Sequence, residues 1–234
     1  IFDCPADTLS LDDLLTNLED FSPDKVFVEV RYPSFTDDLE IANKIIKLDF
    51  KTFLIGPMAH FLDKEIKKHF PQLDIVYEEI EVTIPALCQG KPARNQPDKI
   101  SNLDSLPLPA RHLIKKENYF FRTLLVEPFT TLLSSRGCPF GCAYCPYHII
   151  QGKYQRSRSV KNVIEELKHL VQEGYRSVLF RDPIFTLNQT RTQELCQKMI
   201  QENINLKWWC ETRTDTLDKE LLSLMKEAGL VGIN

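Results

Sequence analysis

Hydrophobic positions in the first part of the chain alternate between two spacings. Short apolar runs rich in β-branched or aromatic residues predict buried strands at 26–30, 52–56 and 74–77. Apolar residues at helical spacing separate these runs: Leu11, Leu14, Leu15 and Leu18, then Leu39, Ala42, Ile45 and Ile46, then Phe61, Leu62, Ile66 and Phe70. Ser10 and Asp13 have the spacing of a capping box at the start of the first helix.

Strands that alternate with helices predict parallel βαβ units. We therefore expect a Rossmann-like α/β layer over residues 1–84, and we expect that the first strand and helix of this layer are missing.

Prolines change the pattern between residues 85 and 128. They stand at Pro85, Pro92, Pro97, Pro107, Pro109 and Pro128. Each proline removes a backbone donor and restricts the residue before it. We expect an extended connector over 85–128, which includes the run LDSLPLPARHLI and is apolar enough to pack on its neighbours rather than move freely.

The alternation of strands and helices resumes over residues 129–234. Apolar runs predict strands at 130–135, 177–180, 206–211 and from 230 onward, with helices at 160–171, 190–203 and 218–228 between them. Trp208 and Trp209 are adjacent on a strand, so they are predicted to face opposite sides. We expect three βα units and the start of a fourth strand, with the carboxyl ends of the strands converging on one face, where barrel active sites lie.

Composition and charge exclude several classes of function. The 234 residues are 43% hydrophobic and 26% charged, as in ordinary globular proteins, and the net charge is −4. This balance gives no global attraction for nucleic acids or anionic membranes, and no apolar run is long enough to span a bilayer. The basic stretch 153–158 is interpreted as a solvated loop.

The cysteines carry the candidate chemistry. Four of the seven are isolated (Cys4, Cys88, Cys196 and Cys210), whereas Cys138, Cys142 and Cys145 lie together in a CxxxCxxC pattern. This distribution predicts a metal site in a reducing, cytoplasmic compartment. Three thiolates of one loop can hold three irons of a cubane [4Fe-4S] cluster and leave the fourth iron open. The alternative is a structural zinc site completed by His148, a site type that this spacing fits less well.

The cysteine segment RGCPFGCAYC resembles the signature of radical S-adenosylmethionine (SAM) enzymes. Downstream, RSRSVKNVIEELKHL, VLFRDPIFTLN, WWCETRTDTLD and LLSLMKEAGLVGIN resemble segments of the same family in the same order. Upstream, the α/β layer followed by LDSLPLPAR resembles the cobalamin-binding domain and connector of the cobalamin-dependent subgroup. The resemblance covers nearly the whole chain. It implies an incomplete (β/α) radical SAM barrel over residues 129–234, and therefore a fragment of a longer protein.

This resemblance implies that the open iron chelates S-adenosylmethionine, whose reductive cleavage yields a 5′-deoxyadenosyl radical. Tyr144 would lie against the adenine, and Asp182 would lie where family members contact the amino group of S-adenosylmethionine. Glu211 and Arg213 would pair with polar groups of this ligand or of the substrate. The alternative for Asp182, Glu211 and Arg213 is ion pairing at the protein surface. The protein's own task is to bind, orient and exclude water.

The resemblance also implies cobalamin, for which Gly56 and Pro57 after the middle strand are the candidate binding residues. We expect a cobalamin-dependent methyl transfer or a related modification of a small molecule or biosynthetic intermediate. A reductant such as flavodoxin or ferredoxin would supply single electrons. The alternatives are a radical SAM enzyme without cobalamin, and an inactive iron–sulfur or zinc-binding fragment with a structural role.

Overall fold

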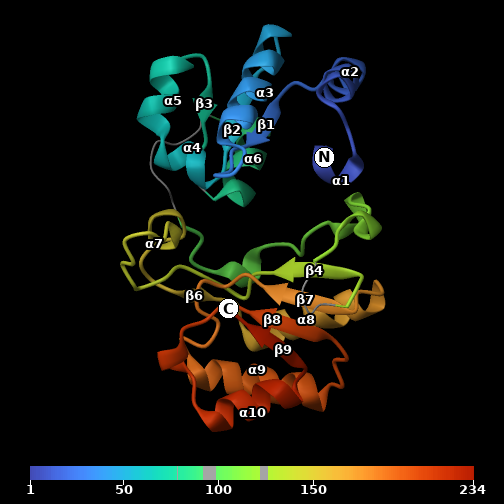
Figure 1. The fold of residues 1–234 in the computed structure, drawn as a ribbon, viewed down its shortest axis with the longest axis vertical. Coiled ribbons are helices and arrows are strands. Elements are labelled where there is room, and N and C mark those ends of the chain that lie inside the picture. The colour runs from blue at the N-terminus through green and yellow to red at the C-terminus, as the bar shows by residue number, and fades with distance from the viewer. Residues whose placement is uncertain (78, 92–98, 122–125) are drawn as a thin grey trace. The chain divides into compact units, whose positions relative to one another are not determined.

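The computed structural model describes residues 1–77, 79–91, 99–121 and 126–234. The chain divides into two compact units, Phe2–Ile100 and Ser101–Asn234 (Figure 1). Both units contain parallel strands linked by helices, which confirms the predicted α/β class. The parts of the expected connector at 92–98 and 122–125 lie outside the described residues.

The first unit has a parallel sheet of strand order β1-β2-β3. The strands are β1 (Val26–Glu29), β2 (Thr52–Ile55) and β3 (Asp74–Ile75). The helices are α1 (Cys4–Asp7), α2 (Leu11–Phe21), α3 (Phe35–Lys47), α4 (Pro57–Phe61), α5 (Asp63–His69) and α6 (Ile80–Cys88). Leu54 on β2 packs with residues of α3 and α5, whereas its neighbour Phe53 packs on the other face with Leu87 of α6.

Local sequence signals account for most of these elements. Ser10 and Asp13 form the predicted capping box, each side chain accepting a hydrogen bond from the backbone N–H of the other. The stripe from Phe61 to Phe70 differs from the prediction, because it is divided between α4 and α5 at Leu62. Pro85, which the pattern assigns to the connector, instead lies inside α6.

The second unit has a parallel sheet of order β4-β7-β8-β9 and a separate two-stranded antiparallel pair, β5-β6. The strands are β4 (Phe129–Leu132), β5 (Ser135–Arg136), β6 (Arg156–Ser157), β7 (Ser177–Phe180), β8 (Lys207–Cys210) and β9 (Leu230–Ile233). The helices are α7 (Tyr147–Ile150), α8 (Val160–Gln172), α9 (Gln189–Gln201) and α10 (Lys219–Glu227), with 3₁₀ turns at Leu103–Ser105, Arg111–Leu113, Lys116–Asn118 and Thr214–Thr216. The expected three βα units and further strand are therefore present.

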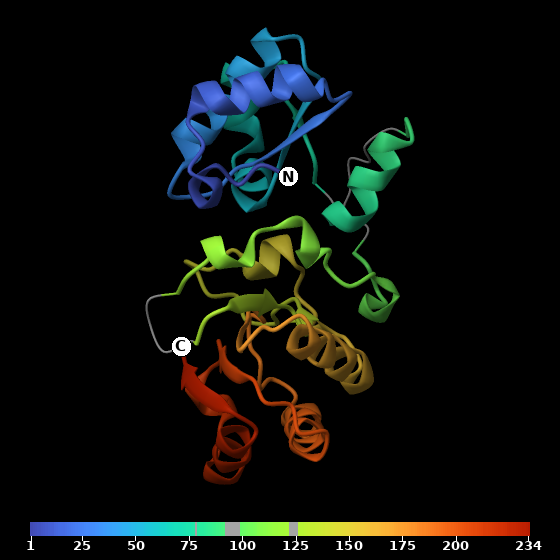
Figure 2. The same ribbon diagram turned by 90° about the vertical axis from the view of Figure 1, so that its right-hand side faces the viewer.

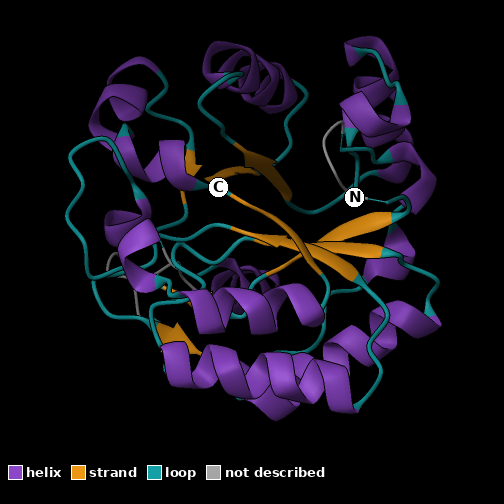
Figure 3. Ribbon diagram, turned by 60° about the horizontal axis from the view of Figure 1, so that its bottom comes forward, coloured by secondary structure: helices purple, strands orange, loops and turns teal. Residues whose placement is uncertain are grey.

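Helices α8, α9 and α10 cover one face of the larger sheet, and Figure 2 shows them beside its strands. Val178, Phe180 and Trp208 point into this apolar layer, where their side chains are fully buried. Trp209 lies on the opposite face against Phe121, which confirms that the two tryptophans face opposite sides. Figure 3 shows the strands flanked by helices.

The predicted strand 130–135 ends early, at Leu132. Arg181 donates the last ladder hydrogen bond to the Leu132 carbonyl, and the Ser134 N–H then donates to the side chain of Asp182 instead of to a strand. Because the ladder stops here, Ser135 and Arg136 leave the larger sheet and pair with β6. This early end starts the cysteine loop.

None of the helices in the described ranges combines the length and the apolar character that crossing a membrane requires.

Candidate active site

The cysteine loop is closed at its base by backbone contacts. Ser135 and Arg136 pair with Ser157 and Arg156, so the two ends of the loop run side by side (Figure 1). Just beyond this pair, the Cys138 N–H donates to the Gly152 carbonyl at 3.0 Å. Gly137 has a φ of 92°, and a Cβ at this position would lie 2.1 Å from the Tyr154 carbonyl oxygen. Only glycine allows the two strands of chain to approach so closely here.

All three thiols of the loop are free. Cys138 is buried, whereas Cys142 and Cys145 are partly exposed and form a turn in which the Cys145 N–H donates to the Cys142 carbonyl at 3.1 Å. Cys196 and Cys210 belong instead to the apolar core, where burial raises the pKa of each thiol. The chemistry of the donor set fits an iron–sulfur cluster, because soft thiolates from one loop are the usual ligands of such clusters.

The zinc alternative requires His148 to join the three thiols. His148 lies in α7, and its Nδ1 is buried without a hydrogen-bond partner. Within the described residues, no three Cys, His, Asp or Glu side chains form a group that could hold a metal ion. This finding includes the three thiols of the cysteine loop, so it does not separate the zinc alternative from the iron–sulfur cluster, and both stay predictions.

Tyr144 projects from the cysteine loop with 91% of its surface exposed. The contact of this exposed ring with adenine stays a prediction. Tyr147, which the sequence analysis did not single out, lies in α7 of the same loop and is partly buried. Burial and the charge of Glu211 raise the pKa of the Tyr147 hydroxyl, whereas Arg181 lowers it.

Glu211 and Arg181 form an ion pair at the ends of β8 and β7. Arg181 forms a side-chain hydrogen bond with Tyr147, and the charge of Glu211 also acts on the Tyr147 hydroxyl. The ion pair therefore lies beside the cysteine loop. The structure thus brings Glu211, an expected ligand-binding residue, close to the loop by way of Tyr147. Arg181 could have been identified from the sequence because it directly follows a buried strand.

Arg213 follows β8 and stacks on the ring of Phe140 in the cysteine loop, with its guanidinium carbon 4.1 Å from the ring centre. Two hydrogen bonds to Asp215, of 2.9 and 2.6 Å, hold the guanidinium. The bond to Asp215 raises the pKa of Arg213, and Cys142 and Cys138 contribute in the same direction. Arg213 is therefore held beside the cysteine loop in an ion pair with Asp215, and its contact with S-adenosylmethionine or the substrate stays a prediction.

Asp182 has a different environment from the one expected of a ligand-binding residue. Its carboxylate is fully buried and accepts hydrogen bonds from the Ser134 N–H, the Ser134 hydroxyl and the Ser135 hydroxyl. Burial raises the pKa of Asp182, while these bonds and the charge of Arg191 oppose that rise. Contact with S-adenosylmethionine stays a prediction, and the structure gives both carboxylate oxygens protein partners.

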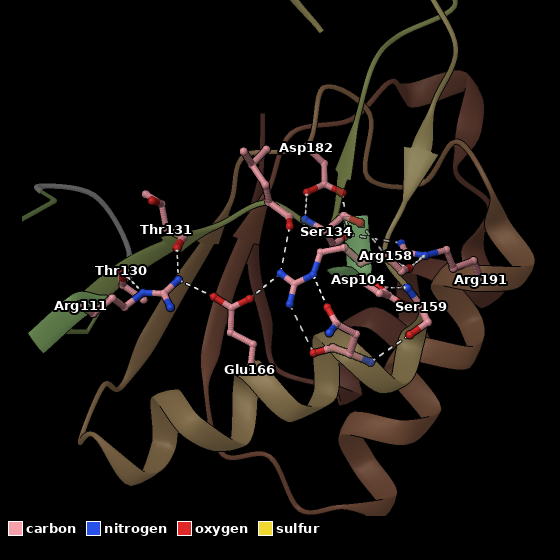
Figure 4. A network of polar contacts seen from close by, with 12 residues as sticks. Asp104, Arg111, Thr130, Thr131, Ser134, Arg158, Ser159, Glu166, Asp182 and Arg191 are labelled. Carbon is pink, nitrogen blue, oxygen red and sulfur yellow. Dashed lines mark hydrogen bonds and ion pairs between the residues drawn. The ribbon is translucent and has the colours of Figure 1, made fainter. Parts of the chain in front are cut away.

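Figure 4 shows a second buried carboxylate, that of Glu166, between Arg111 and Arg158. Glu166 of α8 contacts Arg111 at 2.6 Å and also pairs with Arg158. Arg111 further donates to the Thr131 carbonyl at 2.9 Å, so it ties the LPLPAR segment to β4. Arg158 belongs to the basic stretch interpreted as a solvated loop, and for this residue the interpretation is wrong, because its side chain is only 11% exposed.

Gly56 and Pro57 lie in the first unit, at the turn from β2 into α4. Gly56 has a φ of 95°, and a Cβ there would lie 3.1 Å from the Val30 carbonyl oxygen. The glycine therefore has a structural reason that involves no ligand. Binding of cobalamin at these residues stays a prediction.

Residues 132–234 match the radical SAM superfamily. An uncharacterised methyltransferase of Pyrococcus horikoshii is 29% identical over 98% of this chain and 54% of its own length. The hopanoid C-3 methylase of Methylococcus capsulatus is 28% identical over 93% of the chain and 46% of its own length. The chain thus spans about half the length of these curated relatives.

Solved structures share the fold. The cobalamin-dependent S-adenosylmethionine radical enzyme OxsB aligns with a TM-score of 0.76 and 18% identity, covering 96% of this chain and 37% of that chain. The radical S-adenosylmethionine methyltransferase TsrM of Kitasatospora setae, solved with cobalamin and a [4Fe-4S] cluster, has a TM-score of 0.74 and 19% identity, covering 95% and 52%. The cysteine loop lies within residues 132–234, the segment that matches the radical SAM superfamily.

Proposed function

We propose that this chain carries the S-adenosylmethionine-cleaving core of a cobalamin-dependent radical methyltransferase. The observation that carries the proposal is the cysteine loop, which holds three free thiols and of which Phe140, Cys138 and Cys142 lie near Arg213, a residue that follows β8. The match of residues 132–234 to the radical SAM superfamily supports the same chemistry.

The three cysteines of the loop and Arg213 have separate roles in this proposal. Cys138, Cys142 and Cys145 would hold the cluster through their thiolates. When bound, the cluster supplies the electron that cleaves S-adenosylmethionine. Arg213, stacked on Phe140, would attract the carboxylate of S-adenosylmethionine, which would have to replace Asp215 as the partner of the paired guanidinium hydrogen bonds.

The methyl-transfer part of the proposal rests on the relatives. The Pyrococcus horikoshii and Methylococcus capsulatus proteins are named as a methyltransferase and a methylase, and OxsB and TsrM were solved with cobalamin. Gly56 and Pro57 add no support of their own, so no step is assigned to them. We infer a small molecule or biosynthetic intermediate as the methyl acceptor.

The proposal also implies a reductant and a compartment. Free thiols and an oxygen-sensitive cluster need a reducing environment, so we place the protein in the cytoplasm. A one-electron donor such as flavodoxin or ferredoxin would serve the cluster there.

Electron paramagnetic resonance (EPR) tests the core of the proposal. The chain is reconstituted with iron and sulfide without oxygen, reduced with dithionite, and measured with and without S-adenosylmethionine. We expect a [4Fe-4S]⁺ signal that changes when S-adenosylmethionine is added. Cys142→Ala should abolish the signal, whereas Cys88→Ala should keep it, because Cys88 is an exposed thiol of the first unit. Stoichiometric zinc without any iron signal would refute the proposal.

A separate measurement tests cobalamin. The chain is mixed with hydroxocobalamin and passed through gel filtration, and cobalamin is detected by its visible absorbance. Co-elution supports the cobalamin-dependent function. An intact iron signal without co-elution would favour a radical SAM enzyme that uses no cobalamin.

A further inference from the structure

Asp182 lies at the base of the cysteine loop, where β4 ends and the chain turns into β5 (Figure 4). One carboxylate oxygen accepts from the Ser134 N–H at 2.7 Å. The other accepts from the hydroxyls of Ser134 and Ser135, at 2.6 and 2.7 Å. Three charge-assisted hydrogen bonds from two successive residues fix both the position and the direction of this turn.

Arg191 of α9 holds the same turn from its other side. Its guanidinium donates to the Ser134 carbonyl at 3.1 Å and to the Arg158 carbonyl at 3.0 Å. The Arg158 N–H in turn donates to the Ser134 carbonyl at 2.9 Å. Ser134, which enters the cysteine loop, and Arg158, which leaves it, are thus joined at one point. The carboxylate of Asp182, just after β7, and the guanidinium of Arg191, on α9, hold this point in place.

The tether from this point to the cluster ligands is short. Ser135 precedes Cys138 by three residues, which span about 10 Å of chain when fully extended. Gln155, on the outgoing side, also donates to the Ser135 hydroxyl at 3.2 Å and to the Ile184 carbonyl at 3.1 Å. Because the intervening segment is so short, a displacement of Ser135 would also displace Cys138.

We propose that Asp182 is a positioning residue, which together with Arg191 holds Ser134 and Ser135 and thereby fixes Cys138 in the cysteine loop. The use of this loop for a cluster rests on the proposed function, but the positioning itself is a property of the iron-free chain. Asp182 does not touch S-adenosylmethionine in this proposal, because its carboxylate is fully buried and its two oxygens are bound to protein donors.

The test measures alkylation of single cysteines in the iron-free chain by mass spectrometry. Cys138 is 8% exposed and should react slowly, while the exposed Cys88 serves as an internal reference. Asp182→Asn keeps the side-chain shape but removes the charge and one acceptor oxygen. We expect it to raise the rate of Cys138 relative to Cys88 about tenfold, because the loop opens more often.

A matched control separates positioning from general destabilisation. Asp218 caps α10 by accepting from the Leu221 N–H at 2.7 Å, and it does not contact the cysteine loop. Asp218→Ala should lower the melting temperature and leave the relative Cys138 rate unchanged. If Asp182→Asn and Asp218→Ala raise this rate equally at equal melting temperature, the positioning proposal is overturned.

Ser135→Ala provides a second variant in case Asp182→Asn does not fold. It removes one hydroxyl that bonds to both Asp182 and Gln155, and it should raise the Cys138 rate severalfold. An unchanged rate in this variant would contradict the proposal.

Iron-loaded protein gives an independent result. Loss of the S-adenosylmethionine effect on the EPR signal in Asp182→Asn, with Cys138 alkylation unchanged, would make Asp182 a ligand-binding residue and overturn positioning. If the wild-type chain takes up no iron, the proposed function fails, yet the alkylation result still decides the role of Asp182.

Discussion

The two units of this chain use charged side chains in different ways. In the first unit, Lys51 and Asp74 form an ion pair whose side chains are 57% and 52% exposed. In the second unit, Glu166 is 1% exposed and lies between Arg111 and Arg158, which are 6% and 11% exposed. Burying charges costs desolvation energy, so such a network is weak evidence for added stability. We infer that the role of this network is to fix the arrangement of two segments, because Arg111 belongs to the connector and Arg158 lies at the base of the cysteine loop.

The largest effect is expected from Glu166→Ala. Removing the carboxylate leaves two buried guanidinium groups without their shared partner, and breaking a buried pair in this way costs about 3–5 kcal/mol of unfolding free energy. Urea unfolding followed by circular dichroism measures the loss. As a control, replacing all three residues with apolar ones of similar size should recover most of it. A loss below about 1 kcal/mol for the single variant would remove the distinction between the two units.

The first unit should depend instead on apolar packing. Leu54 of β2 is fully buried, so Leu54→Ala should lower the unfolding free energy by about 2–4 kcal/mol through lost burial and a cavity. The same urea titration measures it. Leu48→Ala, at a position 36% exposed, is the control and should cost much less. Equal losses in both variants would argue against a packed core in this unit.

A moderate effect is expected from the buried thiol of Cys196 at high pH. Burial raises its pKa from 9.0 to about 12, so the unfolded chain loses this proton first as the pH rises. The stability that the protonated thiol contributes is therefore complete below about pH 9 and declines between about pH 9 and 12, by about 1.4 kcal/mol per pH unit.

Urea titrations at several pH values from 8 to 10.5 test this expectation. The unfolding free energy of the wild type should fall more steeply with pH than that of Cys196→Ala. Cys210 stays in both proteins and acts in the same direction, so it cancels from the comparison. Parallel pH profiles would show that Cys196 titrates normally in the folded chain.

The smallest effect is expected from Lys51→Met. Exposed ion pairs contribute about 0–1 kcal/mol, since solvent screens them and ordering two long side chains costs entropy. The unfolding free energy should change by less than about 1 kcal/mol. Added salt should change the difference in unfolding free energy between the variant and the wild type by less than about 1 kcal/mol as well. A loss of unfolding free energy comparable to that of Glu166→Ala would contradict the difference between the exposed ion pair of the first unit and the buried network of the second.

The sequence predicts the elements whose signals are local. The capping box of Ser10 and Asp13 marks the start of α2, and Ser159 caps α8 through the Asn162 N–H. The CxxxCxxC spacing predicts one loop with three thiols because that pattern needs no distant partner. The strand β7 coincides with its predicted range for the same reason.

Features that depend on distant partners could not be predicted in this way. The end of β4 depends on Asp182, which lies 48 residues after Ser134. The burial of Arg158 depends on Glu166 and on the Leu133 carbonyl, which are distant in the sequence. The basic residues around Arg158 therefore predicted a solvated side chain incorrectly. Tyr147 gains its importance only where α7 meets Arg181 and Glu211. Long-range polar contacts of this kind leave no periodic pattern in the sequence.

Gly137 has a consequence for how the molecule can be altered. The missing Cβ lets the chain approach the Tyr154 carbonyl, so the loop is closed at a narrow neck next to the sheet. Residues added on the far side of that neck would extend a segment whose ends are already pinned, and each doubling of such a segment costs only about 0.6 kcal/mol. Insertions beyond the neck should therefore cost the fold little even where they displace the cysteines, whereas any side chain at position 137 would force the neck apart.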